Sequence, residues 1–163
     1  MLKHKSFTLI ELLLVIVILG VIAGITLPNF RQTYTTFKLK STTQQIVSLM
    51  RYARSRAIIE TKIFQMDFDD SLSSYWLLEA ETQLETQGDE ASFKNLTGRY
   101  GKTFRIPAEV KMEVSSSPVN FFPDGGMDET AITLSSHGRR FVISTDQPMG
   151  YLKVWGPFTS FEN

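Results

Sequence analysis

The sequence contains no cysteine, only two histidines and no excess of either charge. Without cysteine it has no disulfide framework, no thiolate zinc site and no cysteine nucleophile. His4 and His137 lie far apart in the chain, which argues against a multi-histidine metal site. Lys and Arg together number 17, as do Asp and Glu, so the basic field typical of general nucleic-acid binders is missing. A length of 163 residues suits one domain with an appendage.

The apolar residues, by contrast, are concentrated near the start of the chain. From Leu12 to Leu27 only Thr26 is polar, and no residue is charged. Extended back to Phe7, a helix of this length spans about 30 Å, enough to cross the hydrocarbon core of a bilayer. A buried core helix would show a polar face, and a removable secretory signal has no use for the carboxylate of Glu11. A retained membrane anchor with a functional intramembrane charge is therefore favoured over these two alternatives.

The residues around this charge carry a specific resemblance. The segment KSFTLIE, residues 5–11, followed by the aliphatic block, resembles the class III signal of type IV pilins and pseudopilins. In that family a prepilin peptidase cleaves a short basic leader before a Phe and methylates the new terminus, which here implies cleavage between Ser6 and Phe7 and methylation of Phe7. The family usually has Gly where this chain has Ser6. The resemblance also implies that Glu11 pairs with a neighbouring subunit's terminal amine and sets the register of assembly, since an unpaired buried charge is costly.

The same resemblance implies four segments and an orientation. Residues 1–6 are the cleaved leader, 7–27 the transmembrane half of a long helix, 28–60 its amphipathic half, and 61–163 a β-rich globular head. The implied location is the bacterial inner membrane, crossed once, with the short N-terminus in the cytoplasm and the head in the periplasm. The charges alone do not decide the orientation, because basic residues flank the apolar run on both sides.

Helical periodicity continues after Pro28, which we expect to bend or locally open the helix. Apolar residues recur at intervals of three or four, a spacing typical of a helix with one buried face. We expect two such stripes to pack against the following domain. They are Phe30, Tyr34 and Phe37, and then Ile46, Met50, Ala53 and Ala57.

From Lys62 the apolar pattern changes to period two, which predicts strands. Residues 64–68 and 75–80 predict a hairpin, and residues 81–101 predict a long loop or insert. The whole indicates an α+β, pilin-like fold, with the long N-terminal helix packed on a β-sandwich-like head. Further short strands are expected at residues 103–106, 110–114, 119–122, 131–135, 141–145 and 151–155.

The order of these pieces resembles the GspH/FimT family of minor pseudopilins and minor pilins. The resemblance lies in a strand followed by FPDGG (residues 122–126), strands at 132–134 and 141–144, and a last turn with Gly150. It implies a structural subunit, not an enzyme and without cofactor, near the tip of a type II secretion fibre that exports folded proteins. The implied partners are other pseudopilins, the prepilin peptidase, the inner-membrane assembly platform and the exported cargo.

Two alternatives stay open at this stage. The first is a FimT-like minor type IV pilin acting in pilus assembly or DNA uptake, with Arg51, Arg54, Arg139 and Arg140 as candidate nucleic-acid contacts. Arg51 and Arg54 share a helix face, but the neutral charge balance favours a solvated face over nucleic-acid binding. The second is an enzyme or a secreted binding protein that uses the apolar segment as a removable signal.

Other chemistry has only weak candidates. His137 lies beside Ser135 and Ser136, but a lone histidine in a Ser-Gly turn favours a loop residue over a serine nucleophile's base. We expect Phe158 and Phe161, past the last strand, to cover a sheet edge or to bind a partner. Two acidic clusters offer the oxygen ligands of calcium, although solvated turns are favoured over a metal site. They are Asp67, Asp69 and Asp70, and then Asp124, Asp128 and Glu129.

Overall fold

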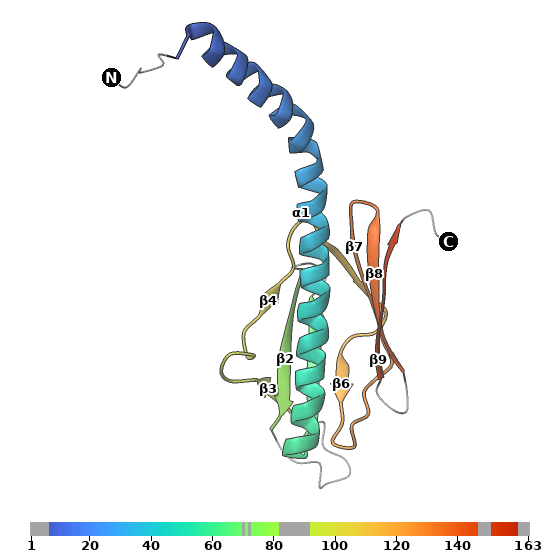
Figure 1. Cartoon of the computed structure of the whole chain (residues 1–163). Helices are drawn as coiled ribbons and strands as arrows, with labels where there is room; N and C mark the ends of the chain where they lie inside the picture. Colours follow the sequence, from blue (N-terminus) through green and yellow to red (C-terminus); the bar gives the residue numbers. More distant parts are fainter. Residues whose placement is uncertain (1–6, 70, 72, 82–91, 147–150, 160–163) are drawn as a thin grey trace. The chain divides into compact units, whose positions relative to one another are not determined.

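The computed structural model describes residues 7–69, 71, 73–81, 92–146 and 151–159, apart from the side chains of residues 25–32, 146 and 159. The chain divides into two compact units, residues 1–35 and 36–163. The first is helical where it is described. The second joins the rest of the helix to two antiparallel sheets (Figure 1).

One helix, α1, runs from Leu9 to Glu60 and includes Pro28. It begins directly after Thr8, whose hydroxyl and carbonyl oxygens accept hydrogen bonds from backbone amides of the first turn. It ends before Thr61, which takes the left-handed conformation (φ 54°) common at the residue after a helix. An ion pair between Arg56 and Glu60, four residues apart, supports the last turn.

The first sheet is built around a hairpin, as the alternating sequence predicts. Strands β1 and β2 pair in an antiparallel register that sets Phe64 opposite Glu79 and Phe68 opposite Tyr75. The order is β3-β2-β1-β6, and β4 also pairs with β2. Its strands are β1 (Phe64–Asp69), β2 (Ser74–Ala80), β3 (Phe93–Asn95), β4 (Phe104–Arg105) and β6 (Val119–Phe121).

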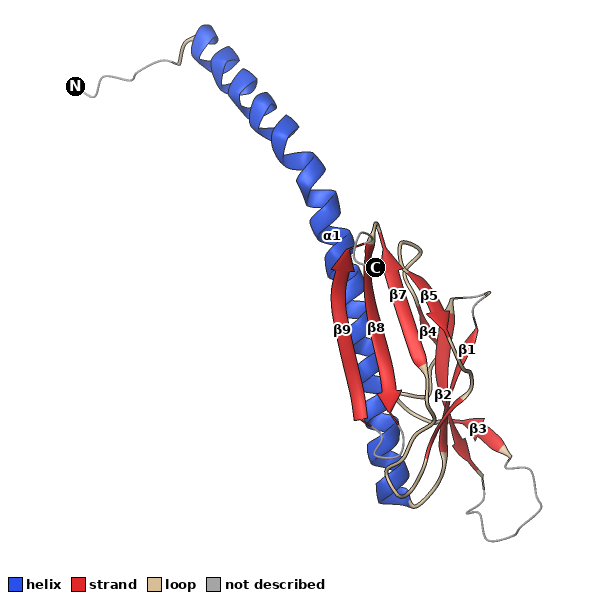
Figure 2. Ribbon diagram, turned by 90° about the vertical axis from the view of Figure 1, so that its right-hand side faces the viewer, coloured by secondary structure: helices blue, strands red, loops and turns tan. Residues whose placement is uncertain are grey.

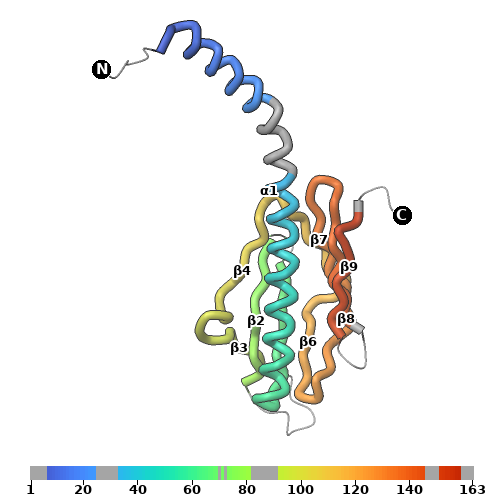
Figure 3. Tube along the Cα trace, viewed as in Figure 1, coloured from blue at the N-terminus to red at the C-terminus, as the bar shows by residue number. Residues whose placement is uncertain are grey.

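The second sheet has the order β5-β7-β8-β9, all antiparallel (Figure 2). Because β6 belongs to the first sheet but lies between β5 and β7 in sequence, the chain crosses between the sheets and returns (Figure 3). The strands are β5 (Lys111–Val114), β7 (Ala131–Ser136), β8 (Arg139–Asp146) and β9 (Tyr151–Thr159).

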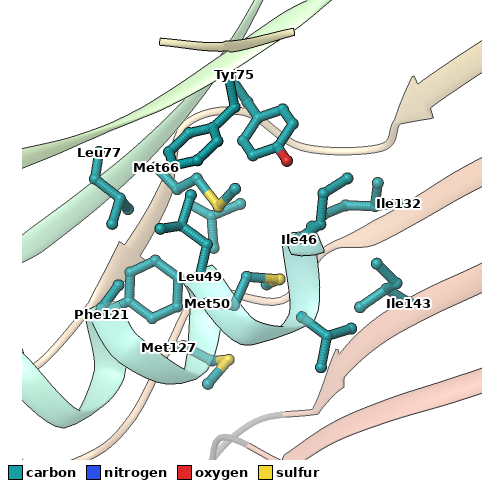
Figure 4. Close-up of a cluster of buried hydrophobic side chains, with 14 of the residues drawn as sticks. Ile46, Leu49, Met50, Met66, Tyr75, Leu77, Phe121, Met127, Ile132 and Ile143 are labelled. Atoms are coloured by element: carbon teal, nitrogen blue, oxygen red, sulfur yellow. The ribbon is translucent and has the colours of Figure 1, made fainter. Parts of the chain in front are cut away.

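A single hydrophobic core joins α1 to both sheets. The predicted helical stripe of Ile46, Met50, Ala53 and Ala57 is confirmed, because all four side chains are fully buried. Burial of each large apolar side chain stabilises the fold by about 1.5–3 kcal/mol relative to exposure. Figure 4 shows Ile46 and Met50 among side chains from the two sheets. The sheet residues of this core include Met66, Leu77, Phe121, Ile132 and Ile143.

The first predicted stripe is wrong where it can be compared. Phe37 is 68% exposed and Tyr34 is 50% exposed, whereas the side chain of Phe30 lies outside the described residues. The buried face of the helix starts only at Leu39, because the core of the head reaches no further along it. Helical spacing identifies an apolar stripe, but a stripe is buried only where another element lies opposite.

The strand predictions are confirmed with small shifts of their ends, apart from two corrections. Residues 81–101 are not loop throughout, since β3 pairs with β2 and Leu96 enters the core. Sequence periodicity missed β3 because three residues are too few to show alternation. The last strand extends to Thr159 rather than ending at Trp155, so Phe158 lies within β9 and not beyond it.

Candidate functional site

The proposed assembly residue, Glu11, lies in the first turn of α1. Its backbone N–H contacts the Thr8 carbonyl oxygen at 3.1 Å and the Thr8 hydroxyl oxygen at 3.3 Å. A carboxylate in this turn is favoured by the positive end of the helix dipole. The spacing Thr8-x-x-Glu11 is also that of a capping box, a sequence signal that predicts where a helix begins. Phe7 is exposed, and Ser6 lies outside the described residues.

The aliphatic side chains that follow Glu11 are exposed in the part of the chain that the structure describes. Every large apolar side chain from Leu12 to Ile22 is at least 42% exposed, and they point all round the helix rather than to one side. Within the described part of the chain, no helical stretch combines the length and the hydropathy needed for a bilayer crossing. Apolar side chains exposed over two turns or more mark a surface that associates with something else.

The two helix arginines behave differently despite their shared face. Arg51 is exposed, whereas Arg54 turns inward and its Nε donates a 2.7 Å hydrogen bond to the Gly125 carbonyl oxygen. Gly125 has φ +87° and is buried in the turn after β6. Arg54 therefore holds the FPDGG turn against α1, a structural task that sequence spacing alone did not indicate.

The two arginines of β8 lie far from this pair. Nη1 of Arg139 donates a 3.0 Å hydrogen bond to the Thr36 hydroxyl, and the Arg140 guanidinium stacks 5.8 Å from the Phe158 ring centre. Thr36 and Arg54 are 18 residues apart on one helix, which is about 27 Å at 1.5 Å per residue. The four candidate nucleic-acid contacts are thus not gathered into one basic patch.

Three residues of the two acidic clusters, Asp69, Asp124 and Asp128, accept local hydrogen bonds. Asp69 Oδ1 accepts hydrogen bonds from the amide and hydroxyl of Ser71, while Asp70 lies outside the described residues. Asp124 Oδ1 accepts from the Gly126 amide at 2.8 Å. Asp128 Oδ2 accepts two hydrogen bonds from Asn120 of β6, at 3.0 and 2.8 Å. No group of three acidic or histidine side chains that could hold a metal ion occurs among the described residues.

His137 lies in the tight turn between β7 and β8, with a positive φ of 46°. The Ser136 hydroxyl lies 3.1 Å from His137 Nδ1, but it donates a 2.6 Å hydrogen bond to the Glu109 carbonyl oxygen. A nucleophilic serine would instead give this proton to the histidine. Ser136 and His137 are thus part of the turn between β7 and β8, as the sequence interpretation of a loop histidine expects.

The edge strand β9 carries exposed aromatic side chains of the head. Tyr151 and Trp155 are both more than half exposed, and Val154 is also open to solvent. Phe158 is partly covered by Arg140, and Phe161 lies outside the described residues. Of the two roles expected for the C-terminal aromatics, Phe158 extends the sheet edge itself instead of covering it.

Two family models match the chain. The prokaryotic N-terminal methylation motif matches residues 1–27, and the type II transport protein GspH matches residues 42–147. The first contains Ser6, Phe7 and Glu11, and the second runs from the buried part of α1 through β8. A search of curated protein sequences found no significant match.

Solved structures show the same fold at low sequence identity. The minor pseudopilin EpsH from the type 2 secretion system of Vibrio cholerae superposes with a TM-score of 0.59 and 10% identity, over 74% of this chain and 98% of that one. A second EpsH crystal structure gives 0.55 and 9% identity, over 74% and 97% of the two chains.

A pilus protein is similar to nearly the same degree. The type IV minor pilin FimU from Pseudomonas aeruginosa gives a TM-score of 0.53 and 14% identity, over 77% of this chain and 97% of that chain. These likenesses confirm the pilin-like fold of a helix packed on antiparallel sheets, while the family model covers well over half of the chain. The chain therefore belongs to the GspH family of type II transport proteins, and this match supports its assignment as a minor pseudopilin of the type II secretion system.

Proposed function

We propose that the chain is a non-enzymatic structural subunit near the tip of a type II secretion fibre, held in the bacterial inner membrane by the first half of α1, with its head in the periplasm. The observation that carries the proposal is the succession of a methylation motif over residues 1–27 and a GspH domain over residues 42–147. The proposed partners are other pseudopilins, the prepilin peptidase, the inner-membrane assembly platform and exported cargo. A FimT-like minor pilin is the second candidate.

The two parts of α1 support different tasks in this proposal. Ile46 and Met50 are buried by the head's own sheets, so this part of the helix belongs to the domain core. The aliphatic side chains before Gly24 are exposed all round, and their cover must come from lipid or from other helices. Lipid before assembly and neighbouring pseudopilin helices afterwards would each remove this surface from water.

Processing of the N-terminus gives Glu11 its proposed partner. Cleavage between Ser6 and Phe7 would leave a positive amine on Phe7, four residues before the carboxylate. Inside a bundle of apolar helices a lone carboxylate is costly, so Glu11 favours the stagger that brings a neighbouring subunit's amine within reach. Glu11 would then set the axial register of the subunit in the fibre.

Mass spectrometry of the mature protein tests the processing step directly. We expect a mature chain that begins at N-methylated Phe7. A Ser6→Gly variant is the matched control for the family's usual residue, and we expect it to be processed to the same terminus at least as fast. A mature terminus near Gly24 would show that the apolar segment is removed, and it would overturn the proposal.

The Glu11 hypothesis is tested by Glu11→Gln, which removes the charge and keeps the shape. We expect unchanged recovery in the membrane fraction and loss of cross-linking into fibres with other pseudopilins. Glu113→Gln, on the exposed side of β5, is the matched control and should assemble normally. Normal fibre incorporation of Glu11→Gln would exclude the register role.

The second candidate rests on the likeness to the minor pilin FimU. In that case the head would serve a pilus, with DNA as its ligand. Salt-sensitive DNA binding that weakens in Arg51→Ala or Arg140→Ala would support it, because phosphate contacts release counterions. These two arginines are the suitable choices, since Arg54 and Arg139 hold α1 to the rest of the head. Absence of binding at low salt would exclude the DNA role.

A further inference from the structure

A pocket of about 310 Å³ lies between α1 and the segment that joins β3 to β4. One wall is formed by Gln45, Ser48 and Leu49 of the helix, and the other by residues 99–104. Leu49 is buried, whereas Gln45 and Ser48 are exposed and lie three residues apart on the same face of α1. The pocket does not overlap Glu11 or any of the four arginines considered above.

The segment that carries the second wall is fixed to the head at three points. Leu96 enters the core, and the Tyr100 ring contacts the Tyr52 ring of α1 in a tilted arrangement with centroids 4.1 Å apart. Phe104 is buried and stacks on Tyr75 at 5.4 Å. Between these anchors Gly101 makes a close turn, because a Cβ there would collide with the Leu96 carbonyl oxygen at 1.5 Å. The wall is therefore formed before any ligand arrives.

Two cations sit on this fixed wall. The Arg99 guanidinium lies 5.9 Å from the Tyr100 ring centre, and Lys102 Nζ lies 5.2 Å from the Phe104 ring centre. Contact with ring faces holds both charges near the pocket. No acidic side chain lines the pocket, and among the described residues neither cation takes part in an ion pair. The pocket thus presents two positive charges with no carboxylate from its own walls.

The pocket wall formed by α1 adds uncharged hydrogen-bond donors. The Ser48 hydroxyl and the Gln45 amide can each donate a hydrogen bond, and Arg99 offers a planar fork that matches the two oxygens of a carboxylate. The buried Leu49 and the ring of Tyr100 suit the apolar part of the same ligand. Two cations, two neutral donors and an apolar floor fit one carboxylate on a short aliphatic stem.

We propose that this pocket binds an acidic side chain, Glu or Asp, of a neighbouring pseudopilin head. The choice of a protein partner rests on the proposed function and on charge complementarity. A nucleic acid would need phosphate contacts spread along a basic surface, whereas this site has two charges within one small pocket on a chain of zero net charge. The contact would link heads at a place distinct from the helix bundle.

Binding is measured with the full chain in detergent micelles by two-dimensional NMR, using N-acetyl-Glu-Leu amide as the probe. We expect saturable shifts at Ser48, Arg99 and Tyr100, and at least tenfold weaker binding of the matched N-acetyl-Gln-Leu amide. The double variant Arg99→Gln/Lys102→Gln should weaken binding of the Glu probe at least tenfold. Both side chains are exposed, so an unchanged melting temperature is expected to verify the fold.

Three results would overturn the proposal. The first is equal binding of the Glu and Gln probes, and the second is undiminished binding of the Glu probe by the double variant. The third is saturation by inorganic phosphate but not by the Glu probe, which would indicate a phosphate site such as a nucleic-acid contact.

Arg51→Gln, which removes a helix arginine outside the pocket, is the control for general charge effects and should bind the Glu probe normally.

The chain's own acidic residues Glu85, Asp89 and Glu90, which lie outside the described residues, are another source of carboxylates. We expect their replacement by Gln to leave the spectrum at Arg99 and the probe affinity unchanged. Changed NMR signals of Arg99 in this variant, together with tighter binding of the probe, would show that the chain fills its own pocket. That result would overturn a partner as the occupant.

A cellular assay separates this inference from the proposed function. We expect Arg99→Gln/Lys102→Gln to be processed and inserted normally, but to reduce secretion and head-to-head cross-linking. If Glu11→Gln blocks fibre assembly while the double variant assembles, cross-links and secretes normally, the pocket inference fails and the proposed function stands. If the chain is not processed as a pseudopilin but the probe still binds, the neighbouring-subunit assignment fails with the proposed function.

Discussion

Arg54 on α1 and Gly125 in the turn after β6 are joined by a 2.7 Å hydrogen bond from the Arg54 Nε to the Gly125 carbonyl oxygen. They lie 71 residues apart in the sequence. The contact holds the turn that precedes β7 against the helix that both sheets share. A Cβ at Gly125 would also meet the Ile58 Cδ1 atom at 3.4 Å, so the turn lies close against α1.

Arg54→Ala should therefore destabilise the head. The substitution leaves the partly buried Gly125 carbonyl without its charged donor, and we expect the free energy of unfolding to fall by about 1–3 kcal/mol. Arg51→Ala, three residues earlier and exposed, is the matched control and should change it by no more than about 0.5 kcal/mol. Urea unfolding followed by circular dichroism measures both. Equal effects of the two variants would contradict a structural role specific to Arg54.

Tyr75 gives a prediction for pH. Its ring is fully buried, its hydroxyl has no hydrogen-bond partner among the described residues, and burial raises the pKa of the phenol above its ordinary value. Above about pH 10 the unfolded chain loses this proton while the folded chain keeps it. The free energy of unfolding should then fall with rising pH by about 1.4 kcal/mol per unit, and should be constant with respect to this group at lower pH.

Tyr75→Phe should remove this alkaline loss. At neutral pH we expect the variant to be as stable as the parent or more so, by up to about 1 kcal/mol, because an unpaired hydroxyl leaves the core. Tyr151→Phe, at an exposed position on β9, is the control and should keep the parent's pH profile. Thermal melting between pH 7 and pH 11 distinguishes the two. A steep alkaline loss in Tyr75→Phe would assign the effect to another group.

Thr145 on β8 is linked to the segment before β7 through one buried hydroxyl. It accepts a 2.8 Å hydrogen bond from the Thr130 amide and donates a 2.6 Å bond to the Asp128 carbonyl oxygen. Thr145→Val keeps the shape and leaves both backbone groups unpaired, so we expect a loss of about 1–3 kcal/mol in the free energy of unfolding. Thr133→Val on β7, where the side chain is only partly buried, should be nearly neutral by chemical denaturation.

Met50 and Phe37 test where the helix joins the core. Met50 is fully buried, so Met50→Ala should lower the free energy of unfolding by about 2–5 kcal/mol. Phe37 is 68% exposed, and Phe37→Ala should change it by no more than about 0.5 kcal/mol. Guanidinium denaturation of the two variants gives the comparison. A large loss in Phe37→Ala would show that the core extends towards the N-terminus of α1.

The elements most open to prediction were those with long periodic patterns. The stripe Ile46–Ala57 and the hairpin of β1 and β2 follow from spacing alone, since helices and strands impose different periods on a buried face. The segment KSFTLIE and the aliphatic run after it carried the resemblance to type IV pilins and pseudopilins, whereas the order of the head strands carried the resemblance to the GspH/FimT family. Short or aperiodic elements were missed, including β3 and the extension of β9 through Gly156.

The candidate sites depended on contacts between distant segments. Arg51 and Arg54 are equivalent by spacing, but only Arg54 lies opposite the FPDGG turn, so they differ in role. The pocket beside Ser48 required residues 99–104 to fold back on α1, which the Tyr52–Tyr100 contact secures. Nothing in the local sequence of either segment indicates this pairing.

By itself the sequence determined the fold class, the family and the position of the N-terminal signal, because hydrophobic periodicity and a local motif are properties of neighbouring residues. Only the tertiary structure decided which apolar stripe is buried, which arginine supports a turn and which cations face a pocket. These properties depend on what lies opposite a side chain across the core, and segments tens of residues apart come together only when the sheets close on the helix.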